Sequence, residues 1–154
     1  MNNVITLAAK ILRAEEGFRS RPYYCSNGYP TIGYGLKIGT KCAPLHFFTL
    51  TLTKEMANAW LLDKCSSLLD QLEQKIPAFI ELNDDRKAIL ISMAYQLGVQ
   101  GLLGFTNTLA CIDADDFDDA AREMLDSKWA EHDSPQRAER HSQVMRTGSI
   151  RGVY

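Results

Sequence analysis

Apolar residues recur at helical spacing through most of the chain, with one long exception between residues 17 and 52. Over positions 4–15 they return every three or four residues, and Gly17 follows as a natural helix stop, which predicts a helix with Glu16 at its C-terminal end. A second stripe begins after Thr53, which can cap a helix, and ends before Pro77. Its members are Leu61, Cys65, Leu68, Leu69, Leu72 and Ile76. At about 1.5 Å per residue, this second helix is long enough to connect two lobes.

The remaining chain predicts four further helices. They cover Asp84–Leu97, closed by Gly98, a segment around Phe105–Ile112, Asp115–Leu125, and Ser134–Met145. The last has a strong start, because Ser134 can act as the N-cap and Pro135 suits the first helical position.

Within the exception at residues 17–52, the first part has the pattern of a β-hairpin. Aromatic residues around Tyr23 and Tyr34 favour strands, and Asn27-Gly28 between them suits the positive φ of a tight turn. Pro30 lacks an N–H, so we expect its strand to be an edge strand or to carry a bulge. From Lys41 to Leu52 no period is visible, which predicts a loop.

Together these elements predict an α+β, mainly helical, bilobed fold. The small lobe would cover about residues 14–52, the linking helix 53–76, and the helical lobe 77–154 together with the N-terminal helix. With 154 residues, one compact domain covering residues 1–154 is expected, with a cleft between the lobes that suits a polymer.

Composition narrows the function. The net charge of −2 gives no overall attraction to nucleic acid, and no apolar run reaches the roughly 20 residues of a membrane span. The N-terminus lacks a signal-peptide block, so the protein is expected in a cytoplasm. The four cysteines, Cys25, Cys42, Cys65 and Cys111, form no CxxC pair, which predicts free thiols and no metal site or other cofactor.

Glu16-Gly17-Phe18-Arg19, then Cys25 after eight residues, then Thr31-Ile32-Gly33-Tyr34-Gly35 after five more, resembles the phage-type (T-even-like) lysozymes. The resemblance continues through Met93–Gly98, Gly104–Leu109, Trp129, Ser134–Arg140 and Arg146–Gly148. It therefore covers nearly the whole chain.

The resemblance implies an endolysin, a muramidase that hydrolyses the β-1,4 bond between N-acetylmuramic acid and N-acetylglucosamine in peptidoglycan. Glu16 would protonate the glycosidic oxygen, and Cys25 and Thr31 would position a water on the other face of the sugar. A holin-type membrane permeabilisation would give access to the wall, and a monomer is the default state.

Cys25 departs from the commoner Asp of this pattern. A thiol of ordinary pKa is a poorer base than a carboxylate at neutral pH, which leaves three roles open. Cys25 could orient water, act as a thiolate base, or attack the sugar itself with retention of configuration.

The resemblance also suggests contacts around these three residues. Arg137 would approach Glu16, favouring its charged form, whereas the C-terminal end of a helix disfavours that form. The candidate glycan contacts are Lys37, Tyr95, Gln96, Thr108 and Glu123. Leu36 stands where the family commonly has His, and the segment from Gly35 to Thr53 is shorter than in the best-known members.

Two other functions remain open on the sequence. A lytic transglycosylase cleaves the same polymer with essentially one acid and leaves anhydro ends. A wall-binding module that has lost turnover would also tolerate Cys25, although the presence of both Glu16 and Thr31 argues against it.

Overall fold

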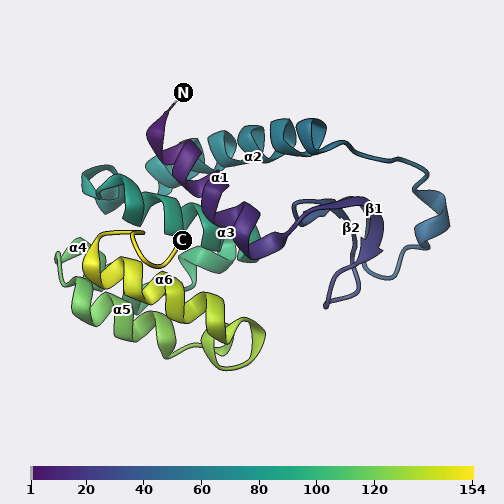
Figure 1. The fold of residues 1–154 in the computed structure, drawn as a ribbon. Helices are drawn as coiled ribbons and strands as arrows, with labels where there is room; N and C mark the ends of the chain where they lie inside the picture. Colours follow the sequence, from purple (N-terminus) through teal and green to yellow (C-terminus); the bar gives the residue numbers. More distant parts are fainter. Residues whose placement is uncertain (1) are drawn as a thin grey trace.

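The computed structural model describes residues 2–154, which form a mainly helical α+β fold. The helices are α1 (Asn3–Glu16), α2 (Lys54–Lys75), α3 (Asp84–Leu103), α4 (Thr106–Asp113), α5 (Phe117–Leu125) and α6 (Pro135–Thr147). The strands are β1 (Arg19–Tyr24), β2 (Pro30–Gly33) and β3 (Leu36–Lys37). Short turns of helix cover η1 (Leu45–Phe47), η2 (Pro77–Glu81) and η3 (Trp129–Asp133). Figure 1 shows the sheet set apart from the helices, reached from the end of α1 and left by the loop that leads to α2.

Local signals explain where the first two long helices begin and end. The Asn2 side chain accepts a hydrogen bond from the Val4 N–H at 2.9 Å, and α1 stops at Gly17, whose φ is 66°. Thr53 caps α2, as expected, by accepting from the Met56 N–H at 3.2 Å.

The sheet is antiparallel with the order β1-β2-β3. Asn27 and Gly28 lie in the predicted turn between β1 and β2, where Gly28 has φ 79° and donates its N–H to the Cys25 carbonyl at 2.8 Å. The β1–β2 pairing carries an irregularity of register between Arg19 and Tyr23, so it lies in the partner strand of Pro30 and not in its own. The edge-strand alternative for Pro30 was wrong, because β2 is the central strand. Proline is tolerated there because it is the first residue of the strand, where its carbonyl still accepts from the Ile38 N–H.

The later helices differ from expectation in two details. Gly98 breaks the helical geometry with φ 77° and ψ 160°, as predicted, but the chain resumes helix beyond it and α3 extends to Leu103. Ser134 occupies the N-cap position of α6 and Pro135 begins the helix, as expected, but the Ser134 side chain makes no capping hydrogen bond. Its hydroxyl instead accepts from the Gln96 side chain at 2.7 Å, a tertiary contact that replaces the local one.

Two groups of buried apolar side chains hold the molecule together. The larger lies among the helices and contains fully buried Leu12, Leu72 and Ile91. The smaller lies under the sheet and consists of Ile32, Leu52 and Ala57. Helix α2 supplies residues to both groups, so it fixes the sheet relative to the helices.

No single helix within residues 2–154 is long and apolar enough to cross a membrane. Helices α3 and α4 pass such a test of length and composition only when taken together, and they meet at a bend of 92°.

Candidate active site

Glu16 is the last residue of α1, and its carboxylate faces the sheet side of the molecule while remaining 20% exposed. Its Oε1 accepts a hydrogen bond from Arg137 Nη1 at 2.8 Å. Its Oε2 lies beside the backbone of Gly35, in the turn between β2 and β3. The two oxygens therefore have different surroundings, and only one of them is held by the arginine.

Arg137 comes from the first turn of α6 and is nearly buried. Besides Glu16, it contacts Ser92 of α3, donating from Nη2 to the Ser92 hydroxyl at 2.9 Å and to the Ser92 carbonyl at 3.1 Å. Its Nε has no hydrogen-bond partner within the described chain. The orientation of this guanidinium thus depends on Glu16 and Ser92 together.

Cys25 follows β1 directly, and Thr31 lies in β2. The Thr31 hydroxyl is buried and donates to the Tyr29 carbonyl at 2.8 Å. Because a hydroxyl carries a single proton, it can turn that proton to the Cys25 sulfur when the sulfur is ionised.

The surroundings of Cys25 favour its thiolate. Burial opposes ionisation, but the backbone N–H groups of Tyr29 and Asn27 can donate to the sulfur. The Thr31 hydroxyl and the charge of Lys37 act in the same direction. The net effect lowers the pKa of Cys25 below the ordinary value of a cysteine.

One cavity of about 120 Å³ brings most of the expected site residues together. It lies between the sheet and α3, and its lining includes Glu16, Tyr23, Cys25, Ser26, Asn27, Thr31, Gly35, Lys37, Tyr95 and Gln96. A second hollow of about 310 Å³ adjoins it, sharing Gly35, Lys37, Tyr95 and Gln96 and adding Lys64 and Leu97. The two hollows form a groove of the kind that an extended polymer needs.

The two α3 residues of this groove are held by hydrogen bonds. The Tyr95 hydroxyl donates to the Tyr34 carbonyl at 2.6 Å and so joins α3 to the sheet. The Gln96 amide donates to Ser134 and accepts from the indole N–H of Trp129 at 2.9 Å. Both side chains are therefore rigid walls of the groove.

Lys37 lies at the end of β3 with its Nζ 4.5 Å from the centroid of the Tyr29 ring. A cation over an aromatic face is attracted to it, which restrains the long side chain. This contact keeps a positive charge at the mouth of the cavity that contains Cys25.

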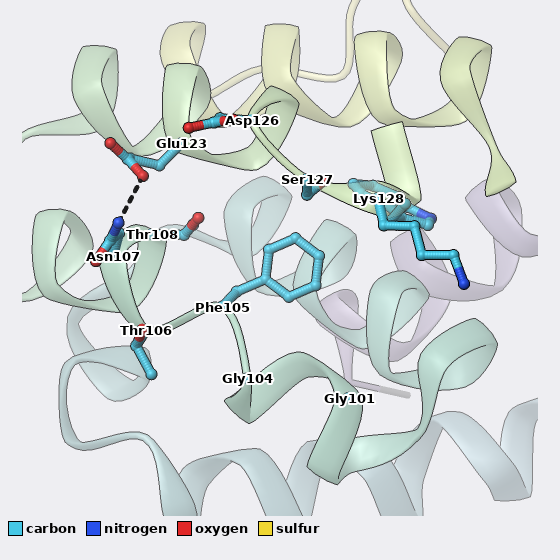
Figure 2. A pocket seen from close by; sticks show the side chains of 11 residues that line it. Gly101, Gly104, Phe105, Thr106, Asn107, Thr108, Glu123, Asp126, Ser127 and Lys128 are labelled. Atoms are coloured by element: carbon cyan, nitrogen blue, oxygen red, sulfur yellow. Dashed lines mark hydrogen bonds between the residues drawn. The ribbon is translucent and has the colours of Figure 1, made fainter. Parts of the chain in front are cut away.

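Thr108 and Glu123 lie elsewhere, in a pocket of about 310 Å³ formed by the end of α3, α4, α5 and the turn before η3. Figure 2 shows Phe105 in this pocket and the hydrogen bond from Asn107 to Glu123, which measures 3.0 Å. Thr108 is 1% exposed. The structure thus separates these two residues from the cavity of Glu16, although Gln96 and the Trp129 wall of this pocket are hydrogen-bonded to each other.

The sequence assigns no role to two residues of the site. Gly35 appears only as the last residue of the Thr31–Gly35 motif, and Ser92 lies in an apolar helical run where nothing predicts a partner for Arg137. No group of three or more histidine, cysteine or acidic side chains suited to a metal ion occurs in the described part of the chain.

This arrangement can donate a proton and place a nucleophile in one cavity. A carboxyl group with one free oxygen can protonate a leaving group, and a thiol beside a hydroxyl can hold a water.

Comparison with known proteins agrees with the motif and the geometry. The model of the family described as Phage lysozyme matches residues 13–144. The probable T4-type lysozyme 1 of Dictyostelium discoideum is 27% identical over 161 aligned residues, which cover 91% of this chain and 94% of that protein. The pre-baseplate central spike protein Gp5 of Enterobacteria phage T4 is 26% identical over 92% of this chain, which spans only 28% of the spike protein. The chain therefore belongs to the phage lysozyme family.

Proposed function

We propose that this protein is a muramidase that hydrolyses the β-1,4 bond between N-acetylmuramic acid and N-acetylglucosamine in peptidoglycan. The observation that carries the proposal is the Glu16 carboxylate, which has one oxygen bound to Arg137 and the other free in a cavity shared with Cys25 and Thr31. Membership of the phage lysozyme family supports the same class of activity.

In the proposed reaction, the proton of Glu16 passes to the glycosidic oxygen as the bond to the anomeric carbon breaks. We assign the proton to Oε2, because Oε1 is occupied by Arg137. A water held by Cys25 and Thr31 then bonds to the anomeric carbon and gives one proton to the Cys25 thiolate, whose lowered pKa favours the ionised form. Attack by such a water inverts the configuration at that carbon.

The first experiment is digestion of purified cell walls by wild-type protein and by Glu16→Gln, with the product ends identified by mass spectrometry. Glu73→Gln is the control, because Glu73 is an exposed carboxylate on α2 outside the groove. Reducing muramic acid ends that disappear only in Glu16→Gln are the expected result. Anhydro ends would identify a lytic transglycosylase instead, and wall binding without any product would identify a binding module.

The anomeric configuration of fresh product, followed by NMR, separates the roles of Cys25. Inversion is expected if Cys25 positions or deprotonates water. Retention, with a sugar bound to Cys25 in trapped protein, would make the sulfur the nucleophile and overturn the water mechanism.

We further propose that the polymer contacts both the groove and the separate pocket that contains Thr108 and Glu123. Lys37, Tyr95 and Gln96 would contact the glycan in the groove, and Thr108 and Glu123 would contact a part of the wall polymer that reaches the pocket in Figure 2. Substitution of Glu123 by Ala is expected to raise KM for wall fragments several-fold with little change in kcat. An unchanged KM would remove this pocket from the binding surface.

The proposed biological role is host lysis by an endolysin that accumulates in the cytoplasm as a monomer and reaches the wall after a holin-type permeabilisation of the membrane. Expression in a bacterium with and without a membrane-permeabilising protein tests this. Lysis that requires the second protein is expected, and lysis without it would overturn the cytoplasmic location. Size-exclusion chromatography with light scattering tests the monomer.

A further inference from the structure

A row of buried hydrogen bonds runs behind the active-site arginine and away from the cavity. Arg137 Nη2 contacts Ser92 Oγ at 2.9 Å, Ser92 Oγ contacts His141 Nε2 at 2.9 Å, and His141 Nδ1 contacts the Tyr154 hydroxyl at 2.8 Å. The Tyr154 hydroxyl in turn contacts Glu15 Oε1 at 2.5 Å. Ser92 and His141 are fully buried, so water does not substitute for these contacts.

The Tyr154 end of this row and the charge of the ring fix the direction of its protons. An ionised carboxylate only accepts, so Tyr154 gives its single proton to Glu15 and accepts from His141 Nδ1, which must carry a proton. A neutral ring then has a bare Nε2. The Ser92 hydroxyl accepts from Arg137 with a lone pair, keeps its own proton and donates it to this nitrogen. His141 is therefore the neutral tautomer with its proton on Nδ1.

The charges around the row agree with this assignment. Burial lowers the pKa of His141 well below its ordinary value, and the nearby Arg137 and Arg140 lower it further, so the ring is neutral. Burial opposes ionisation of Glu15, but hydrogen bonds from Arg140 and Tyr154 outweigh it and lower the pKa of Glu15. Arg140 holds both oxygens of that carboxylate at 2.8 Å.

We propose that Ser92, His141 and Tyr154 are positioning residues, which act as a one-way hydrogen-bond chain from Arg137 to Glu15 and thereby hold Arg137 in place for Glu16. The inference rests on the proposed function of Glu16. Arginine is long and flexible, and Nε of Arg137 has no partner within residues 2–154. Without the Ser92 hydroxyl, Nη2 of the guanidinium keeps only its contact with the Ser92 carbonyl. A carboxyl displaced by about 1 Å can cost on the order of 100-fold in rate.

The first test reads the tautomer and needs no activity. Long-range ¹⁵N–¹H NMR of His141, assigned with His46→Gln and His132→Gln variants, is expected to find a protonated Nδ1 and a bare Nε2. Tyr154→Phe removes only the hydroxyl and is expected to move part of the population to the Nε2–H form. A wild-type ring protonated at Nε2, alone or with Nδ1, would overturn the chain.

The second test compares two buried serines. Ser92→Ala is expected to lower kcat on wall fragments about tenfold or more with KM within about twofold, because Ser92 contacts Arg137 and lines neither hollow of the groove. Ser142→Ala is the matched control, since Ser142 is equally buried on α6 but donates to the Glu139 carbonyl. Tyr154→Phe should lower kcat in the same way, and Ser92→Thr, which keeps the hydroxyl, should recover most of the rate.

The outcomes separate the two proposals. If Ser92→Ala and Tyr154→Phe lose no more kcat than Ser142→Ala, the positioning role is wrong while the muramidase proposal stands. If wild-type protein cleaves no wall, the proposed function fails and the positioning role fails with it. The tautomer of His141 then still decides whether the hydrogen-bond chain from Arg137 to Glu15 exists.

Discussion

Gly35 and Glu16 are so close that any side chain at position 35 would have to displace the Glu16 carboxyl. A β-carbon on Gly35 would lie 2.5 Å from Oε2 of Glu16 and 2.8 Å from its carboxyl carbon. Gly35 also has φ 73°, a conformation that costs about 1–3 kcal/mol for most other residues. The backbone of the β2–β3 turn thus forms one wall of the space that holds the free carboxyl oxygen.

Substitution of Gly35 by Ala is expected to remove most of the wall-cleaving activity, because the methyl group must displace the Glu16 carboxyl. Gly152→Ala is the matched control, since Gly152 has φ 76° and a β-carbon there would meet nothing within 4 Å. Urea denaturation should find losses of about 1–3 kcal/mol from the backbone in both variants. Activity should fall only in Gly35→Ala, and an equal, small effect of both variants on kcat would contradict the role of this close approach.

The elements that the sequence predicted are those whose ends depend on local chemistry. Gly17 ends α1, Thr53 begins α2 and Gly98 interrupts α3, each because of a cap or a positive φ that its own residue supplies. The failed expectations involve tertiary contacts. The Ser134 hydroxyl binds Gln96 instead of its own helix. Pro30 was expected in an edge strand because β3, which pairs with the other side of β2, is only two residues long and leaves no pattern in the sequence.

The site shows the same division. Glu16, Cys25 and Thr31 lie within one short segment, and the resemblance of that segment to the phage-type lysozymes implied a common site. The contacts of Ser92, His141 and Tyr154 could not be predicted, because a polar residue in a helical stripe gives no sign of which distant partner it meets.

Cys25 can be tested by exchange with its oxygen analogue and with a carboxylate. Cys25→Ser is expected to lower kcat about 100-fold, because a hydroxyl does not ionise in this range and is a poor acceptor of a proton from water. Cys25→Asp is expected to remain active, since a carboxylate can accept that proton. Cys42→Ser, on an exposed cysteine, is the control. Equal kcat for Cys25→Ser and wild type would mean that the sulfur takes no part in the reaction.

Lys37 is expected to contribute to the acidity of Cys25. Burial opposes the thiolate, so the lowered pKa of Cys25 depends on its hydrogen bonds and on the charge of Lys37. Lys37→Met should therefore raise the pKa of Cys25, seen as a shift to higher pH in the rate of alkylation by iodoacetamide at that residue.

Mass spectrometry of the modified peptides provides the internal reference for this experiment. Cys65, whose pKa burial raises to about 12, should stay unmodified while the protein is folded. Lys64→Met, which removes a charge from the adjoining hollow, should leave the profile of Cys25 in place. If Lys64→Met shifted the pH profile of Cys25 alkylation as far as Lys37→Met does, the effect would come from the overall positive charge of the groove and not from Lys37 itself.

His141 should make the protein less stable in mild acid. Its folded pKa lies well below the ordinary 6.5, so below that pH the unfolded chain binds a proton that the folded protein refuses. Stability therefore falls as the pH drops below about 6.5, by about 1.4 kcal/mol per pH unit at most. Glu15 has the opposite type of shift, and its stabilising contribution is lost only at lower pH, as the pH falls from its unfolded value of 4.5 through its folded pKa.

Urea denaturation at pH 6.5 and pH 5.0 separates these two groups, because only the histidine contributes over that interval. Wild type is expected to lose about 1–2 kcal/mol more than His141→Gln, which has no ring to protonate. His132→Gln, on an exposed histidine, should follow wild type. If His141→Gln lost as much stability as wild type, the buried ring would have to accept a proton in the folded state, and the neutral tautomer that directs the chain from Arg137 to Glu15 would be wrong.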